Sequence, residues 1–132
     1  MIAHELGHTQ QAFFDGDTLL AAALNEGVAE FVVELTSGAP LNAEMFARAD
    51  ARAAEIERAF AAEMMGADKS RWLYNGSGTE AWPGDLGYWV GYRIARSYYD
   101  RMPDKRAAVR TMLKSTDPRA FLKASGWPPA SN

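Results

Sequence analysis

The chain of 132 residues is about the size of one domain, so we expect one core and one site. A hydrophobic share of 48% and a charged share of 23% are typical of a globular protein and exclude intrinsic disorder. The formal net charge of −3, with no basic run, argues against nucleic acid as a partner, and the absence of cysteine excludes disulfides and thiolate metal sites.

Alanine-rich segments with a repeat of about 3.6 residues predict helices almost throughout, so we expect an all-α chain. The most apolar stretch, residues 19–35, contains three glutamates and is too polar for a membrane span. No basic and apolar leader precedes the first motif, so no export signal is visible. The expected helices cover residues 2–14, 19–35, 42–65, 86–102, 104–114 and 117–126.

Local signals mark several of the expected helix ends. Thr18 and Asp85 have the chemistry of N-caps, and Asp117 is followed by a proline at the first helical position. A turn is expected at residues 15–17, and the second helix should stop at residues 37–40.

The third expected helix has an apolar stripe that we interpret as core. The alternative is a helical interaction domain without metal, in which this stripe is a groove for a partner. The stripe consists of Met45, Phe46, Ala49, Ala53, Ile56, Phe60 and Met64.

The only two histidines lie four residues apart in His4-Glu5-Leu6-Gly7-His8, the HExxH pattern. On a helix they share one face, about 6 Å apart along the axis, so both imidazoles can bind one Zn²⁺ ion while Glu5 lies over the same face. Zinc suits two nitrogen ligands, and the carboxylate can hold a metal-bound water. The alternative is a chance spacing.

A third ligand is available in the sequence NEGVAE at residues 25–30. A short turn would place this helix antiparallel to the first, so that Glu26 completes a set of two histidines and one glutamate with a fourth position open for water. Glu30, one turn further, could accept the second ring N–H of a ligand histidine. The alternative is a solvated acidic face, although the surrounding helix is apolar nearly all round.

With these two motifs the chain resembles the gluzincin type of zinc metallopeptidase, whose pattern is HExxH followed on the next helix by NEGxAE. The resemblance implies that His4, His8 and Glu26 bind Zn²⁺, that Glu5 is the general base, and that Glu30 orients a ligand. The implied reaction is hydrolysis of a peptide bond in a peptide or protein substrate.

Residues 86–94 and 117–126 look like segments of an uncharacterised bacterial family of predicted zinc-dependent proteases, which is similar to gliding-motility lipoproteins. This resemblance implies a location in the bacterial cell envelope or periplasm. Zincin domains place a β-sheet before the HExxH helix, whereas here only three residues precede His4. We therefore interpret residues 1–132 as a single helical domain, the carboxy-terminal part of a zincin-like domain whose upstream β-sheet is missing.

A hydrolase of this type needs a donor for the oxyanion, and both histidines are assigned to the metal. Tyr92 is the first candidate and Tyr88 the second, because they share a helix face, and Gly91 permits close approach of another backbone. Arg93 is a cationic alternative, and the tyrosines could instead simply pack their rings. A further alternative for the whole chain is a zincin-derived binding module without turnover.

Overall fold

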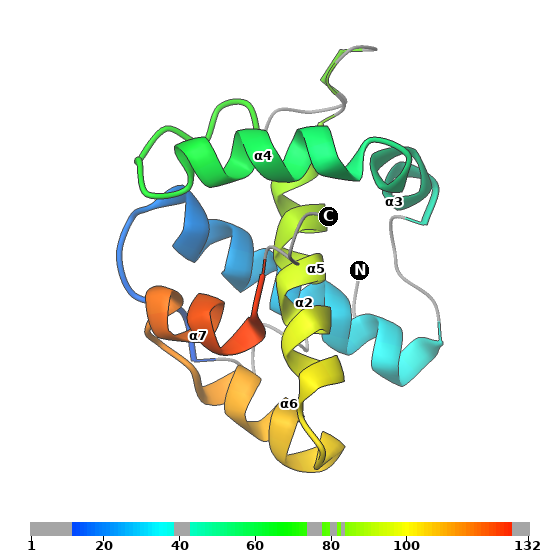
Figure 1. The fold of residues 1–132 in the computed structure, drawn as a ribbon, viewed down its shortest axis with the longest axis vertical. Helices are drawn as coiled ribbons and strands as arrows, with labels where there is room; N and C mark the ends of the chain where they lie inside the picture. Colours follow the sequence, from blue (N-terminus) through cyan, green and yellow to red (C-terminus); the bar gives the residue numbers. More distant parts are fainter. Residues whose placement is uncertain (1–11, 39–42, 74–77, 80–81, 83, 128–132) are drawn as a thin grey trace.

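A computed structural model describes residues 12–38, 43–73, 78–79, 82 and 84–127. Over these residues the fold is all-helical, as expected, with six α-helices and no strand (Figure 1). None of these helices combines the length and apolar character that crossing a membrane requires. The helices are α2 (Leu19–Ser37), α3 (Ala43–Asp50), α4 (Ala53–Glu63), α5 (Leu86–Arg101), α6 (Lys105–Lys114) and α7 (Pro118–Ser125).

Helices α2 and α5 cross at the centre of the molecule (Figure 1). Helices α3 and α4 lie at one end of the longest axis and α6 lies at the other, while α7 packs beside α5. Because α3, α4, α6 and α7 all contact α5, this helix is the common support of the fold.

Helix α2 begins and ends at local signals. The Thr18 hydroxyl accepts the N–H of Ala21 at 3.1 Å, which satisfies one of the free donors of the first turn. The helix continues two residues beyond the expected Leu35 and ends at Gly38, whose φ of 88° is a left-handed conformation that glycine adopts without strain. The expected cap and stop signal are confirmed.

The segment before α2 corrects the first expected helix. Residues 12–14 are not helical, and two of their N–H groups bond to other elements: Ala12 donates to the Leu113 carbonyl at 2.7 Å and Phe14 to Asn25 Oδ1 at 2.7 Å. The end expected at Phe14 is therefore wrong. The rest of that expected helix, and its antiparallel packing on α2, lie outside the described residues.

The single helix expected over residues 42–65 is also wrong, since the chain breaks at Ala51 and Arg52 into α3 and α4. One straight helix of that length would extend about 36 Å, and the break instead lets both halves of the apolar stripe face α5. Phe46 and Phe60, from the two halves, are both buried. The stripe is therefore core, as expected, and is not available as a partner groove.

The remaining helices start largely as expected. Asp104 accepts the N–H of Ala107, and Asp117 accepts two N–H groups at the start of α7. Asp85 precedes α5 but makes no capping hydrogen bond through its side chain, because its backbone is left-handed with φ of 60° rather than extended. The side-chain cap expected at Asp85 is therefore wrong.

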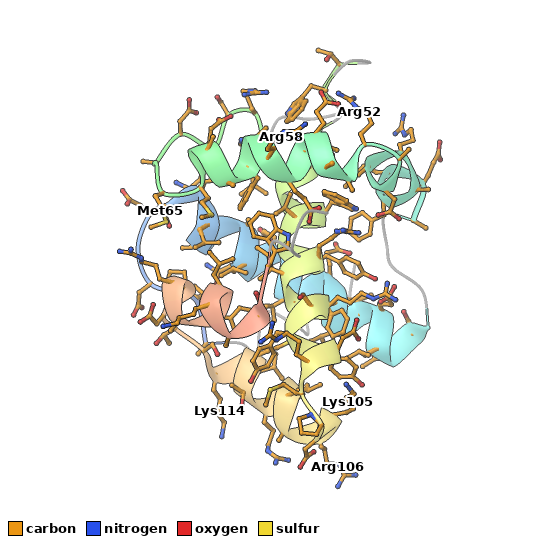
Figure 2. The ribbon with its side chains drawn as sticks, in the orientation of Figure 1. Arg52, Arg58, Met65, Lys105, Arg106 and Lys114 are labelled. Carbon is orange, nitrogen blue, oxygen red and sulfur yellow. The ribbon has the colours of Figure 1, made fainter. Side chains whose placement is uncertain are left out.

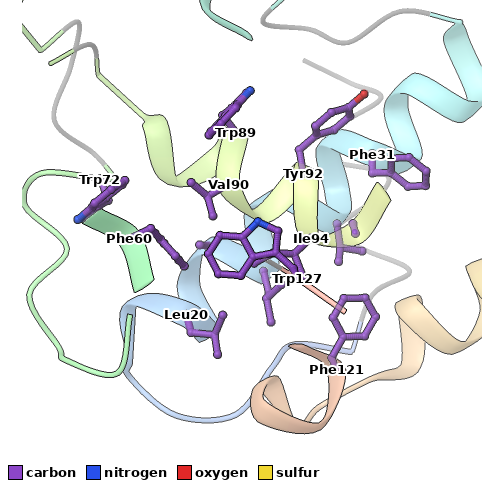
Figure 3. Close-up of a cluster of buried hydrophobic side chains, with 14 of the residues drawn as sticks. Leu20, Phe31, Phe60, Trp72, Trp89, Val90, Tyr92, Ile94, Phe121 and Trp127 are labelled. Atoms are coloured by element: carbon purple, nitrogen blue, oxygen red, sulfur yellow. The ribbon is translucent and has the colours of Figure 1, made fainter. Parts of the chain in front are cut away.

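An aromatic core fills the space between the helices (Figure 3). Trp127, which follows α7, inserts its ring beside Phe60 with ring centres 5.9 Å apart, and Trp72 lies against the same ring at 5.2 Å. The Trp127 indole N–H donates to Glu57 Oε2 at 2.6 Å. This hydrogen bond ties the chain after α7 to helix α4 and gives the indole the polar partner that burial demands.

Two glycines allow the close crossing of α2 and α5. A Cβ atom at Gly27 would lie 2.1 Å from the carbonyl carbon of Gly91, and a Cβ atom at Gly91 would lie 1.9 Å from the Ala23 oxygen. The two backbones therefore touch with no room for a side chain, which confirms the close approach expected at Gly91.

Candidate functional site

The predicted metal site is only partly within the described structure. His4, Glu5 and His8 lie outside the described residues, whereas Glu26 and Glu30 lie on α2. Among the residues that are described, no three His, Cys, Asp or Glu side chains gather into a metal-binding group. The zinc ligand set therefore stays a prediction.

One flank of α2 carries a series of acidic side chains. Glu26, Glu30 and Glu34 follow one another at intervals of four residues, so they lie one turn apart along the helix. Glu26 is partly buried and Glu30 is only 2% exposed. Glu30 is therefore not part of a solvated acidic face. Burial of a carboxylate is costly unless a partner compensates for the lost water.

The same flank is buried outside the main core. Ala29 and Val33, which neighbour Glu30 along α2, have relative exposures of 0% and 1% but do not belong to the core cluster formed by the described residues. Helix α2 therefore buries two surfaces: one packs onto α5 through Gly27, and the other surrounds Glu30.

Tyr92 from α5 meets the last of the three acids. Its hydroxyl lies 2.7 Å and 2.6 Å from the two carboxylate oxygens of Glu34, and Arg96 Nη1 donates to the hydroxyl oxygen at 3.3 Å. Burial, reinforced by the Glu34 carboxylate, raises the pKa of Tyr92 to about 12. The hydroxyl therefore keeps its proton at neutral pH and directs it to Glu34.

Tyr92 is positioned by rings as well as by Glu34. Phe46 lies 4.8 Å and Phe31 5.8 Å from its ring, between centres. Tyr88, the second candidate, is partly buried against the core. The oxyanion role of either tyrosine stays a prediction.

Arg93, the cationic alternative, lies within a structural network. Its guanidinium donates to Glu57 at 3.3 Å and 3.4 Å and lies 3.8 Å from Asp50. It also stacks over the ring of Trp89 at 5.0 Å. These contacts join α5 to α3 and α4, so the Arg93 guanidinium stabilises the packing of three helices.

A cavity of about 560 Å³ opens beside Tyr92, between α2, α3, α5 and the chain at Trp127. Charged groups line its wall together with the rings of Phe46 and Tyr92. Sequence reasoning named Tyr92 and Arg93 but missed Glu34 and Arg96. The four-residue spacing from Glu30 to Glu34 and from Tyr92 to Arg96 was the available signal.

Comparison with known families gives one match. Residues 68–129, just under half of the chain, match the family described as "Gliding motility protein GldB". The matched part contains α5, α6 and α7 and both segments 86–94 and 117–126, but not residues 4–30. No curated protein and no solved structure matches the chain.

This result corrects the family resemblance. The identification as a gluzincin-type metallopeptidase is wrong as a family assignment, because the family model that matches is described as a gliding motility protein and no peptidase family model matches. HExxH is a short pattern that fixes only two ligands and a carboxylate, and on its own it does not define a family.

Proposed function

We propose that this chain is a zinc-dependent peptidase that hydrolyses peptide bonds through a metal-activated water, with His4, His8 and Glu26 as the zinc ligands. The proposal rests on these residues themselves and not on a family assignment. The observation that carries it is Glu30, a carboxylate only 2% exposed that lies one turn from Glu26 on α2. A buried acid beside a ligand is the usual means of orienting a metal-binding imidazole.

The donor set suits zinc. Two imidazoles and one carboxylate are the protein ligands of one common type of catalytic zinc site. The helix that carries the carboxylate packs closely on its neighbour, because Gly27, next to Glu26, lies directly against the α5 backbone. Zinc bound there would lower the pKa of a bound water toward ~7.

The protein groups would then divide the work of hydrolysis. Glu5 would accept the proton of the attacking water and pass it to the leaving amine. Glu30 would accept the free ring N–H of a ligand histidine and so fix its tautomer. A protonated donor would also be needed at the oxyanion.

Zinc content and turnover test the proposal separately. The purified chain should contain about one zinc per molecule by elemental analysis, and His8→Ala should contain much less. Glu5→Gln should keep its zinc and lose peptide hydrolysis by about 10²-fold or more. Equal zinc in His8→Ala, or full turnover by Glu5→Gln, would contradict the assignment.

Glu30 provides the sharpest variant. Glu30→Gln should weaken zinc binding by roughly 10- to 100-fold, as loss of an orienting carboxylate does. Glu44→Gln, an acid exposed on α3, is the matched control and should leave zinc affinity unchanged. If both variants bind zinc like the parent chain, Glu30 has no part in the site.

A second candidate is a binding module without turnover, and the match to a gliding motility family favours it. The name of that family model refers to lipoproteins, which is consistent with a protein of the cell envelope. A periplasmic location stays a prediction that cell fractionation would test. Stoichiometric zinc with no hydrolysis of a diverse peptide library would favour this candidate over the peptidase.

A further inference from the structure

Charge is unevenly distributed along the chain. Residues 102–127 contain six lysines and arginines but only two acids, Asp104 and Asp117. The formal charge of residues 102–127 is therefore +4. Because the whole chain has a net charge of −3, the remaining residues carry −7. The cations are spaced along helices rather than in a run, so the sequence shows no basic block.

Helix α6 gathers three of these cations into one stripe. Arg106, Arg110 and Lys114 follow one another at intervals of four residues, opposite the buried residues Ala108 and Met112. All three are exposed. Together they form the α6 basic stripe.

The carboxylates of Asp104 and Asp117, near the stripe in the sequence, accept backbone N–H groups at helix starts. Asp104 accepts the Ala107 N–H as the cap of α6, and Asp117 accepts two N–H groups as the cap of α7. Within the described part of the chain, no ion pair joins a cation of the α6 basic stripe to a carboxylate.

A shallow hollow of about 350 Å³ lies along this stripe, lined by Arg110, Thr111, Lys114 and Ser115. The two cations and the Thr111 hydroxyl are donors that suit phosphate oxygens, whereas the Ser115 hydroxyl already donates to the Thr111 carbonyl at 2.6 Å. The helix dipole favours a cation in the last turn, and this explains Lys114. The same dipole disfavours a cation in the first turn, so it does not explain Arg106.

We propose that the α6 basic stripe docks the protein on a membrane surface rich in anionic phospholipid headgroups. The stripe lies at one end of the longest axis, where Arg106 and Lys114 project from the molecule (Figures 1 and 2). A planar anionic surface can touch this end alone and keep the acidic remainder away. A long flexible polyanion such as nucleic acid would also meet the acidic sides and be repelled, so the lipid surface is the better fit.

Vesicle binding tests the proposal on the whole chain. The protein should bind vesicles of phosphatidylcholine with about 30% phosphatidylglycerol and not vesicles of phosphatidylcholine alone, and added salt should weaken the binding. Each cation near such a surface contributes about fivefold, so Arg106→Gln with Arg110→Gln should weaken binding by roughly 25-fold.

The matched control is Arg48→Gln with Arg58→Gln, which changes the net charge equally at two exposed positions of α3 and α4, at the other end of the molecule. It should alter binding by less than about twofold. Thermal unfolding of both double variants checks that they fold. Equal losses in both, equal binding to neutral vesicles, or tighter binding to long single-stranded DNA than to anionic vesicles would overturn the proposal.

Discussion

The crossing of α2 and α5 gives the most direct test of the fold. In Gly27→Ala the new Cβ atom would lie 2.1 Å from the Gly91 carbonyl carbon and 2.3 Å from the Tyr92 nitrogen. Non-bonded carbon atoms pack at about 3.5–4.0 Å, so the two helices would have to separate by more than about 1 Å. The contacts are with backbone atoms, which cannot rotate away as a side chain can.

The expected cost follows from two opposing terms. Overpacking a core costs about 1–3 kcal/mol, and a clash with backbone belongs at the upper end of that range. Alanine regains about 1 kcal/mol through its higher helix propensity. We therefore expect a net loss of about 2 kcal/mol, which lowers the urea midpoint by about 1 M at an m-value of about 2 kcal/mol/M.

Urea denaturation followed by circular dichroism measures this loss, and Gly66→Ala is the control. A Cβ atom at Gly66 would meet only the Glu63 oxygen at 3.4 Å, so that variant should change stability by less than about 0.5 kcal/mol. If Gly27→Ala is as stable as Gly66→Ala, the backbones do not touch at this crossing and the reasoning is wrong.

Two further predictions concern single polar groups. Because the pKa of Tyr92 is raised to about 12 in the folded protein from its ordinary value of 10, its stabilising contribution is complete below pH 10 and is lost as the pH rises toward 12. The parent chain should therefore lose more stability than Tyr92→Phe between these pH values, and equal losses would contradict the assigned environment. Asp117→Ala should cost about 1 kcal/mol in urea denaturation because it removes the cap of two N–H groups, whereas Asp117→Asn should cost much less; similar costs would mean that the cap contributes little.

Helix ends were predictable wherever one residue type decides the local geometry. Thr18 and Asp117 cap helices with their side chains, and Gly38 and Gly126 end helices in left-handed conformations that disfavour other residues. These signals lie within a few residues of the feature that they set, so sequence reasoning could find them.

Features set by distant parts of the chain were not predictable. The break at Ala51 and Arg52 contains neither glycine nor proline, and it depends on the shape of the core that both halves cover. The non-helical segment at Phe14 is held by Asn25 and by carbonyls far along the chain. The contact between Tyr92 and Glu34 joins residues 58 positions apart, so the four-residue spacing on each helix could place these residues on a face but could not show that the two faces meet.

The geometry of α2 bears on what Tyr92 does if the chain is a peptidase. Glu34, the partner of Tyr92, lies two turns beyond Glu26, which corresponds to about 12 Å along the helix axis. An oxyanion donor must lie within hydrogen-bond distance of the reacting carbonyl, whereas an extended peptide covers about 12 Å in three to four residues. The cavity beside Tyr92 therefore suits a subsite for a substrate residue distant from the scissile bond.

The kinetics of Tyr92→Phe, measured with longer and shorter peptides, distinguish an oxyanion donor from a subsite contact. Loss of an oxyanion donor would lower kcat by about 10²-fold for every substrate. Loss of a subsite contact should raise KM for peptides long enough to reach the cavity, by a few-fold, and leave kcat and the shorter peptides unchanged. We expect the second pattern, because the Tyr92 hydroxyl proton is already directed to Glu34 and away from Glu26. A uniform fall in kcat would refute this and return Tyr92 to the reacting centre.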